Sequence, residues 1–338
     1  MIYLEMSERA TSQGIGNKLA LLLAVCYRVA PYSGKPPYEP ISLIDPVWID
    51  VHGEVMSCDY SSPHSSFSQI YDMDYFNDCM KSEKIQIISR NSVPDGHSLM
   101  QVSDHCTWTR YAKLMKNLRA FGSQKGFISS NDFFTMFRNP NPLPVKIFFK
   151  MYEALKLNQD NNILIKSYLE DNNISNMGSV QFITERDWVH SGAFYHRNYE
   201  SRERVLEMYK KQFPTEKNIF FTCGENHEKE AETCRKFGLN PHYYYNPDLG
   251  YDLNAAINVE LCAQAKNFSG NSISTFTNLI TTKRFIFGLN ESYIYNRQRE
   301  LTERQDGGIY TEIPSDTRYG PTTNPDYSFP PIQIYERN

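Results

Sequence analysis

Apolar stretches of strand length alternate with stretches of helical pattern along most of this chain. Residues 2–6 have the composition of a short buried strand. A loop of small residues follows, and LALLLAVCYRVA then has the pattern of a buried helix. Because parallel strands are joined by crossovers that usually contain a helix, this order predicts an α/β fold with a parallel sheet. ISLIDPVWIDV, interrupted by a proline, and KIQIISR predict further strands.

A second series of alternating segments begins near residue 163. Strands are predicted at 179–183, 218–223 and 265–270, and helices at SRERVLEMYKKQF, ENHEKEAETCRKFG and AAINVELCAQA. Strand and helix follow one another at the spacing of a second doubly wound sheet. The predicted fold class is therefore α/β, with two Rossmann-like, doubly wound domains that face a cleft.

The length of the chain allows two medium-sized domains. The sequence has 338 residues, 40% of them hydrophobic and 14% aromatic, which is enough for two substantial cores. We expect an N-terminal domain at 1–160 and a C-terminal domain at 161–305. The remaining residues, 306–338, are rich in Pro, Tyr, Thr and Asp and are expected to form a tail that packs back on the body.

The net charge and the cysteine content limit the classes of protein to which this chain can belong. The formal net charge of −4 gives no reason to expect nucleic acid as a partner. The seven cysteines are scattered without a CxxC pair, which predicts reduced thiols. The longest apolar run, LALLLAV, is too short to span a bilayer, and MIYLEMSERA lacks the features of a signal peptide. We therefore expect a cytoplasmic protein without a membrane span; its oligomeric state stays open.

The stretch FSGNSISTFTNLITTKR concentrates small hydrogen-bonding residues at the predicted start of a helix. A strand ends at Gly270, and Asn271, Ser272, Ser274 and Thr275 follow it. The helix that starts near Thr275 adds the positive end of its dipole at the same place. Such a site binds anions, and phosphates in particular. The alternative is an ordinary capped helix start, since Ser and Thr are common N-caps.

In these residues the chain resembles the GDP-fucose protein O-fucosyltransferase family. AAINVELCAQAKNFSGNSISTFTNLITTKR is similar to the C-terminal motif of that family. The residues in register with it are Glu260, Cys262, Gly270, Asn271, Ser274, Thr275, Phe276 and Arg284. SQGIGNKLALLLAVCYRVA resembles the N-terminal Gly-x-Gly-Asn loop and helix, and SSFSQIYDMDYFNDCMKSEKIQIIS resembles the segment between the two. The three matches occur in family order and span most of the chain.

The resemblance implies a GT-B type glycosyltransferase that is inverting and needs no metal or other cofactor. It would transfer a fucose-like sugar from a GDP-sugar donor to a hydroxyl of a glycan or protein acceptor, the first domain lying on the acceptor side. Without a leader, a cytoplasmic enzyme of bacterial or viral origin fits best. The donor-binding residues implied are Gly14, Gly16, Asn17, Asp187, Asn271, Ser274, Thr275 and Phe276. Phe276, Phe194 and Tyr245 are candidates for stacking on the base.

One family motif is altered in this chain. The family has His-x-Arg at the end of the first strand of the second domain, where this sequence has Gln181 and Ile183. Arg186 is the candidate that replaces the lost charge on the diphosphate. Glu8 is the candidate base for the acceptor hydroxyl, with Glu5 as an alternative. Further possibilities are His52, Glu54 and His190. The altered motif also favours a second hypothesis, a catalytically inactive protein that binds nucleotide sugars or glycans.

Asp72 and Asp74 raise a third hypothesis. An Asp-x-Asp motif holds a divalent metal on the diphosphate in glycosyltransferases of the other major fold, so a metal-dependent or UDP-sugar transferase stays open. The alternative is that Asp72 caps the following helix and Asp74 lies at its positive end. A dinucleotide-binding enzyme is disfavoured, because Leu19 stands where the third glycine of G-x-G-x-x-G is required.

Overall fold

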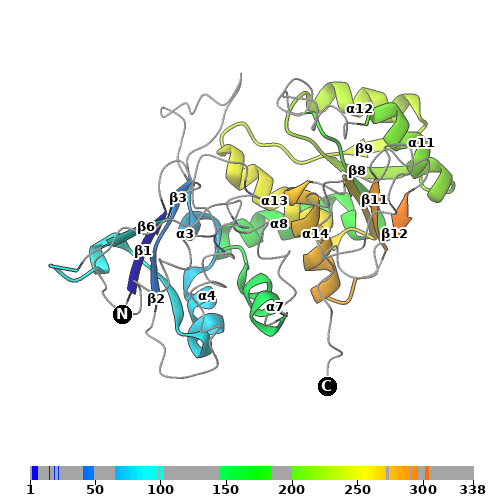
Figure 1. Ribbon diagram of the computed structural model, residues 1–338. Helices are drawn as coiled ribbons and strands as arrows, with labels where there is room; N and C mark the ends of the chain where they lie inside the picture. The colour runs from blue at the N-terminus through cyan, green and yellow to red at the C-terminus, as the bar shows by residue number, and fades with distance from the viewer. Residues whose placement is uncertain are drawn as a thin grey trace, which may run out of the picture.

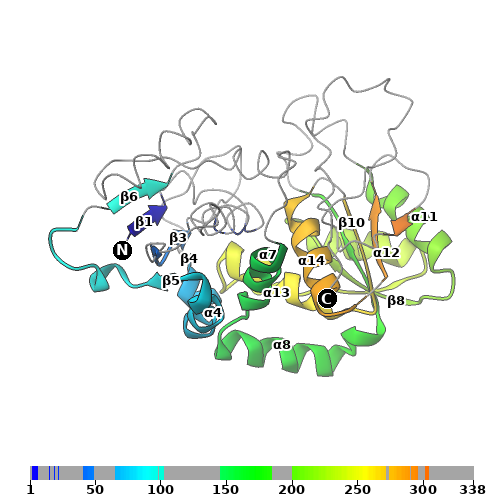
Figure 2. The ribbon, with the colours of Figure 1, turned by 60° about the horizontal axis from the view of Figure 1, so that its bottom comes forward.

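The computed structural model has two lobes, each built on a sheet, with helices between them (Figure 1). It describes residues 2–6, 15, 19, 22, 41–48, 65–97, 99–102, 145–184, 200–271, 274–289, 291–295 and 301–303. Both views of the ribbon show the first sheet on one side and the second sheet on the other (Figures 1 and 2). The tail predicted at 306–338 lies outside the described residues.

The first sheet is parallel throughout, as the sequence predicts. Its strands are β1 (Ile2–Met6), β2 (Ile41–Ile44), β5 (Ile85–Ile88) and β6 (Leu99–Val102), in the order β5-β2-β1-β6. The predicted proline break is Pro46, which lies between β2 and the short strand β3 (Val47–Trp48). β3 pairs antiparallel with β4 (Ser65–Ser66). Strand β6 was not predicted.

The second sheet has six strands among the described residues, in the order β12-β11-β10-β7-β8-β9. They are β7 (Gly178–Gln181), β8 (Asn218–Thr222), β9 (Asn240–His242), β10 (Asn267–Asn271), β11 (Ser292–Tyr295) and β12 (Thr302–Glu303). All pairs are parallel except that of β11 with β12. The three predicted strands of this sheet are confirmed as β7, β8 and β10.

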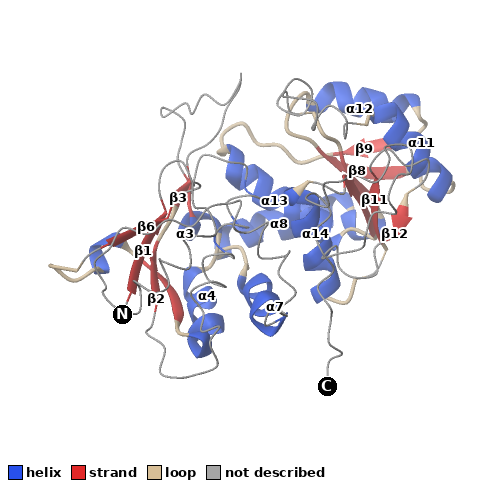
Figure 3. Ribbon diagram, in the orientation of Figure 1, coloured by secondary structure: helices blue, strands red, loops and turns tan. Residues whose placement is uncertain are grey.

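Helices cover both faces of the second sheet (Figure 3). The described helices of the chain are α3 (Phe67–Ile70), α4 (Met73–Met80), α7 (Val145–Ala154), α8 (Gln159–Asn172), α11 (Arg202–Gln212), α12 (His227–Lys236), α13 (Tyr251–Gln264) and α14 (Thr275–Ile286). Side chains alternate along β8 as strand geometry requires. Ile219 and Phe221 join the core under α11 and α12, and Phe220 joins the core under α13 and α14. The predicted doubly wound arrangement is confirmed.

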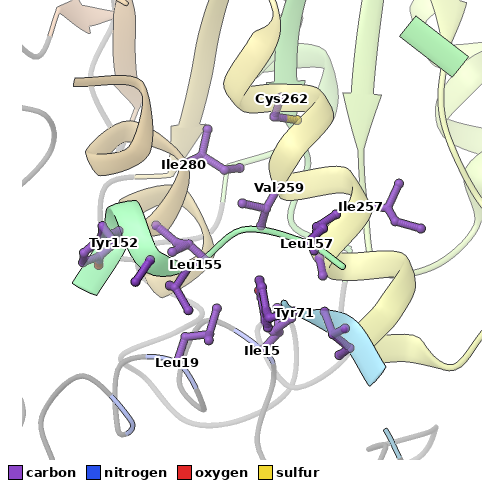
Figure 4. Close-up of a cluster of buried hydrophobic side chains, with 14 of the residues drawn as sticks. Ile15, Leu19, Tyr71, Tyr152, Leu155, Leu157, Ile257, Val259, Cys262 and Ile280 are labelled. Atoms are coloured by element: carbon purple, nitrogen blue, oxygen red, sulfur yellow. The ribbon is translucent and has the colours of Figure 1, made fainter. Parts of the chain in front are cut away.

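The core on the α13 and α14 side continues into the first lobe. Helix α7 packs on α4 of the first lobe and on α14 of the second. Figure 4 shows the buried cluster where these elements meet, with Ile15, Leu19 and Tyr71 facing residues of α13 and α14 across the chain that follows α7. The two lobes therefore share one apolar core. The domain boundaries at residues 160 and 305 stay predictions.

The described residues carry no sign of a membrane segment or of a cystine. No helix among them combines the length and the apolar character needed to cross a membrane. Cys79, Cys223, Cys234 and Cys262 are free thiols. Burial raises the pKa of the Cys262 thiol to about 12, so this side chain is protonated and inert at neutral pH.

Candidate functional site

The second sheet changes direction between β7 and β10. From β7 the chain moves outward to β8 and β9, and from β10 it moves outward on the other side to β11. In open α/β sheets, ligands bind outside the carboxyl ends of the strands at such a switch point. Gln181 ends β7 and Asn271 ends β10, so both residues lie at this point.

Helix α14 begins at the switch point, next to the carboxyl ends of β7 and β10. Ser274 is its N-cap, and the Ser274 hydroxyl accepts a hydrogen bond from the Thr277 backbone N–H at 3.4 Å. The predicted strand and helix start are thus confirmed, with β10 ending at Asn271, one residue later than predicted. Ser272 lies outside the described residues. The twelve-residue helix directs the positive end of its dipole to the carboxyl ends of β7 and β10. This arrangement suits an anionic ligand.

Gly270 allows α14 to approach β10 closely. A Cβ atom at this position would lie 2.8 Å from Cζ of Phe268 and would collide with the side chain of Thr277. Thr277 is in the first turn of α14 and is fully buried. A glycine is therefore required here for the close approach of strand and helix, and its φ angle is not the reason.

Replacing Gly270 by alanine is expected to lower the free energy of unfolding by about 1–3 kcal/mol, the usual cost of overpacking. Urea unfolding of the purified chain measures the change. In the double variant Gly270→Ala/Thr277→Ala the obstructing hydroxyl and methyl are absent, so the alanine at 270 should cost less than it does in the wild-type background. Equal costs in the two backgrounds would contradict the packing shown at Gly270.

Gln181 occupies the place of the histidine in the His-x-Arg motif of the resembled family, and its side chain is buried. Its amide Nε2 donates to the Ser274 hydroxyl at 3.1 Å, and the Thr277 hydroxyl donates to its Oε1. The Tyr295 hydroxyl donates to the Gln181 backbone carbonyl at 2.6 Å. The sequence identified Gln181 only as a departure from the motif. These bonds could not be read from it, because the partners are far apart in the chain.

The charged residues of the C-terminal motif form contacts inside the protein. Arg284 is completely buried and donates to the carbonyl oxygens of Cys262, Ala263, Ala265 and Lys266 and to the Ser292 hydroxyl. It thereby satisfies the carbonyls at the end of α13, where a cation is also favoured by the helix dipole. Burial lowers the pKa of Arg284 to about 10, so it stays protonated at neutral pH.

Glu260 of the same motif pairs with Lys283. The Lys283 ammonium also donates to the Leu155 carbonyl at 3.0 Å, just after α7. This pair therefore connects α13 and α14 of the second lobe to the segment that leads from the first. Glu260, Lys283 and Arg284 support the framework of the site rather than its ligand-facing edge.

Tyr245 lies in the segment that follows β9, at the carboxyl-end edge of the sheet. Its ring is 53% exposed and stacks on His227 with ring centroids 4.6 Å apart. His227 stacks in turn on Tyr243. Burial lowers the pKa of His227, so this ring is neutral at pH 7. The sequence identified Tyr245 as a stacking candidate but not its two aromatic neighbours. Phe276 is half-buried and packs against the core.

Several predicted site residues lie outside the part of the chain that the structure describes. They are Glu8, Gly14, Gly16, Asn17, Arg186, Asp187 and Phe194. Their roles stay predictions. Thr275 is described as the first residue of α14, and Asn271 is buried at the end of β10. Glu5, the alternative candidate base, forms an ion pair with Arg90 in which Oε1 and Nη1 are 2.9 Å apart.

Asp72 acts as a helix cap. It is the N-cap of α4, and its Oδ1 accepts a hydrogen bond from the Tyr75 backbone N–H at 2.9 Å. Asp74 lies in the first turn of the same helix, where a carboxylate is favoured. The capping hypothesis for this pair is confirmed. The described residues contain no group of three His, Cys, Asp or Glu side chains that could hold a metal ion.

Replacing Asp72 by alanine is expected to lower the free energy of unfolding by about 0.5–2 kcal/mol, because one N–H of the first turn loses its partner. Asp72→Asn keeps a capping oxygen, so it should lower the free energy of unfolding by only a few tenths of a kcal/mol. Urea unfolding with and without Mn²⁺ measures both variants. A wild-type stability that rises with Mn²⁺, and no longer does so in Asp72→Asn, would instead indicate a metal ligand.

Of the comparisons with known proteins, the one with solved structures found matches. No family model and no curated protein matches the sequence. Among solved structures, that of POFUT1 in complex with GDP superposes with a TM-score of 0.53 at 13% identity, covering 84% of this chain and 94% of that one. NodZ alpha-1,6-fucosyltransferase co-crystallized with GDP gives 0.52 at 12% identity, with 89% and 98% covered. The fucosyltransferase NodZ from Bradyrhizobium gives 0.51 at 12% identity.

This chain has the fold of those fucosyltransferases. The prediction of a GT-B type α/β protein, made from three motifs and from the alternation of strands and helices, is confirmed. Because the match covers more than nine-tenths of each of these structures, it includes both lobes and their connection.

Proposed function

We propose that this chain is a glycosyltransferase that transfers a fucose-like sugar from a GDP-sugar to a hydroxyl of a glycan or protein. The observation that carries the proposal is the switch point between β7 and β10, where the Ser274 cap and the start of α14 form an anion-binding geometry. The fold supports it, since POFUT1 and NodZ are both described in complexes with GDP and with GDP-fucose. We place the enzyme in the cytoplasm.

In the proposed reaction the acceptor oxygen attacks the anomeric carbon as the bond to the diphosphate breaks. The leaving diphosphate gains charge in the transition state, so donors fixed before the reaction lower the barrier most. The start of α14 and the Ser274 hydroxyl supply such donors, and Arg186 is proposed to add a cation. Glu8 is proposed to take the proton of the acceptor hydroxyl. Attack opposite to the leaving group inverts the anomeric centre, and no metal is required.

Calorimetric titration with GDP, GDP-fucose and UDP-sugars, with and without EDTA, tests this function. We expect GDP and GDP-fucose to bind, and EDTA to leave their affinity unchanged. Ser274→Ala should weaken GDP binding by roughly tenfold or more, because a hydrogen bond to a charged group is lost. Ser201→Ala is the matched control, since Ser201 caps α11 in the same way, accepting from the Arg204 N–H at 3.3 Å. It should lose stability but keep GDP affinity.

The contrary results separate the alternatives. Preference for a UDP-sugar, or affinity lost in EDTA, would point to a different donor or to metal dependence. Absence of binding to every nucleotide sugar would reject the proposed function.

A catalytically inactive nucleotide-sugar binding protein is the second candidate function. The specific observation in its favour is that two buried uncharged residues, Gln181 and Ile183, stand where the motif has His and Arg. This second candidate function predicts that GDP-fucose binds, but that neither sugar transfer nor slow hydrolysis to GDP is detected. Chromatography that measures the release of GDP from GDP-fucose decides between an active transferase and an inactive binding protein.

A further inference from the structure

The side chain of Gln181 joins the end of β7 to the first turn of α14. Gln181 is only 4% exposed, and its amide lies between the hydroxyls of Ser274 and Thr277. Its backbone carbonyl is held by the Tyr295 hydroxyl from β11. The side-chain amide is therefore held by the first turn of α14 and the main chain of Gln181 by β11, so this residue is not a flexible contact to a ligand.

The Ser274 hydroxyl has its acceptor capacity filled. An oxygen of a hydroxyl has two lone pairs, and here one receives the Thr277 backbone N–H and the other the Gln181 Nε2–H. Within the described part of the chain this hydroxyl receives both bonds and donates none. Its own O–H is thereby left as a donor, and Ser274 is only 5% exposed.

A side-chain amide meets both demands at position 181. Oε1 must accept from the Thr277 hydroxyl, and Nε2 must donate to Ser274. A guanidinium has no acceptor, and a carboxylate has no donor when ionised. A carboxylate would also reverse the bond to Ser274, whose O–H would then be consumed inside the protein.

We infer that Gln181 is a positioning residue that makes the Ser274 hydroxyl a dedicated donor for an oxygen of the nucleotide diphosphate. The inference rests on the proposed function. In it, Gln181, which stands at the place of the histidine in the family's His-x-Arg motif, belongs to a neutral cradle that binds phosphate by directed hydrogen bonds. An acceptor-only group such as a phosphate oxygen fits this hydroxyl, whereas a donor group does not.

The test compares the affinities of GDP and guanosine for four chains: wild type, Gln181→Met, Ser274→Ala and the double variant. Gln181→Met removes the amide without adding charge, and we expect it to weaken GDP binding roughly five- to tenfold while guanosine affinity stays unchanged. In the Ser274→Ala background the same change should have no further effect on GDP, because Gln181 acts through that hydroxyl. Titration calorimetry follows GDP, and saturation-transfer NMR follows guanosine.

Two further variants make the result specific. Gln181→Glu should weaken GDP binding more than Gln181→Met, because it reverses the bond to Ser274 and adds a negative charge. Asn161→Leu is the control for the loss of a buried amide, since Asn161 is 5% exposed and donates to the carbonyls of Gln69 and Ile70. It should lose stability without a change in the ratio of GDP to guanosine affinity.

The outcomes distinguish this inference from the function on which it rests. Absence of GDP binding by the wild-type chain overturns both. Equal GDP affinity of wild type and Gln181→Met, with each chain folded by circular dichroism, overturns the positioning role alone. Additive losses for Gln181→Met and Ser274→Ala also overturn it, since the two residues would then act independently. Should Gln181→Glu fail to fold, the Gln181→Met and Ser274→Ala cycle decides the question without it.

Discussion

Replacing Arg284 by methionine is expected to lower the free energy of unfolding by at least about 3 kcal/mol. Methionine fills most of the space of the arginine stem but donates no hydrogen bond. The carbonyls of Ala263, Ala265 and Lys266 would lose their buried donor, and α13 would lose the cation at its negative end. Urea or guanidinium unfolding measures the loss.

Two variants control this experiment. Arg284→Lys keeps the charge, but one ammonium cannot reach all the carbonyls that the guanidinium fork serves, so it should recover only part of the stability. Arg235→Met removes an exposed arginine from the last turn of α12 and should change stability by no more than about 0.5 kcal/mol. An Arg284→Met chain of unchanged stability that no longer binds GDP would contradict the framework role and assign Arg284 to the ligand.

Local features of the candidate site were predictable from the sequence. The end of β10, the Ser274 cap and the start of α14 all depend on residues within a few positions of one another. Such features follow from short-range chemistry, in which a hydroxyl satisfies an N–H of the first helical turn. The cap at Asp72 was predictable for the same reason.

Long-range features of the site were not predictable in this way. The bonds of Gln181 join residues separated by 93 and 96 positions, and nothing in the local pattern indicates them. Strand β9 was missed because it has three residues and contains Pro241, which disfavours a strand except at the edge of a sheet, where β9 lies. Similarly, the residues around the motif arginine at position 284 do not indicate that its partners are carbonyls of α13 and of the connection between α13 and β10.

Replacing Leu155 by alanine is expected to lower the free energy of unfolding by about 2–5 kcal/mol, the usual range for a leucine deleted from a well-packed core. Leu155 is 2% exposed and lies in the cluster that α7 and the first lobe share with α13 and α14 (Figure 4). Its carbonyl also accepts from Lys283, so the backbone around it is fixed and cannot collapse easily into the space left behind. Leu164→Ala is the matched control, because Leu164 is 42% exposed on α8 and should cost far less.

The same variant tests whether the lobes behave as one unit. Two domains joined by a small polar contact unfold and move independently, whereas a large apolar interface couples them. Because Ile15 and Tyr71 of the first lobe pack with Val259 and Ile280 of the second, we expect one urea transition, with intrinsic fluorescence and circular dichroism coinciding. Leu155→Ala should move both signals to lower urea together. If Leu155→Ala separated the two signals, or if the wild-type chain already showed two transitions, the lobes would unfold independently. The donor and acceptor groups would then have to be brought together by closure of the lobes, because the shared core would not hold them in place.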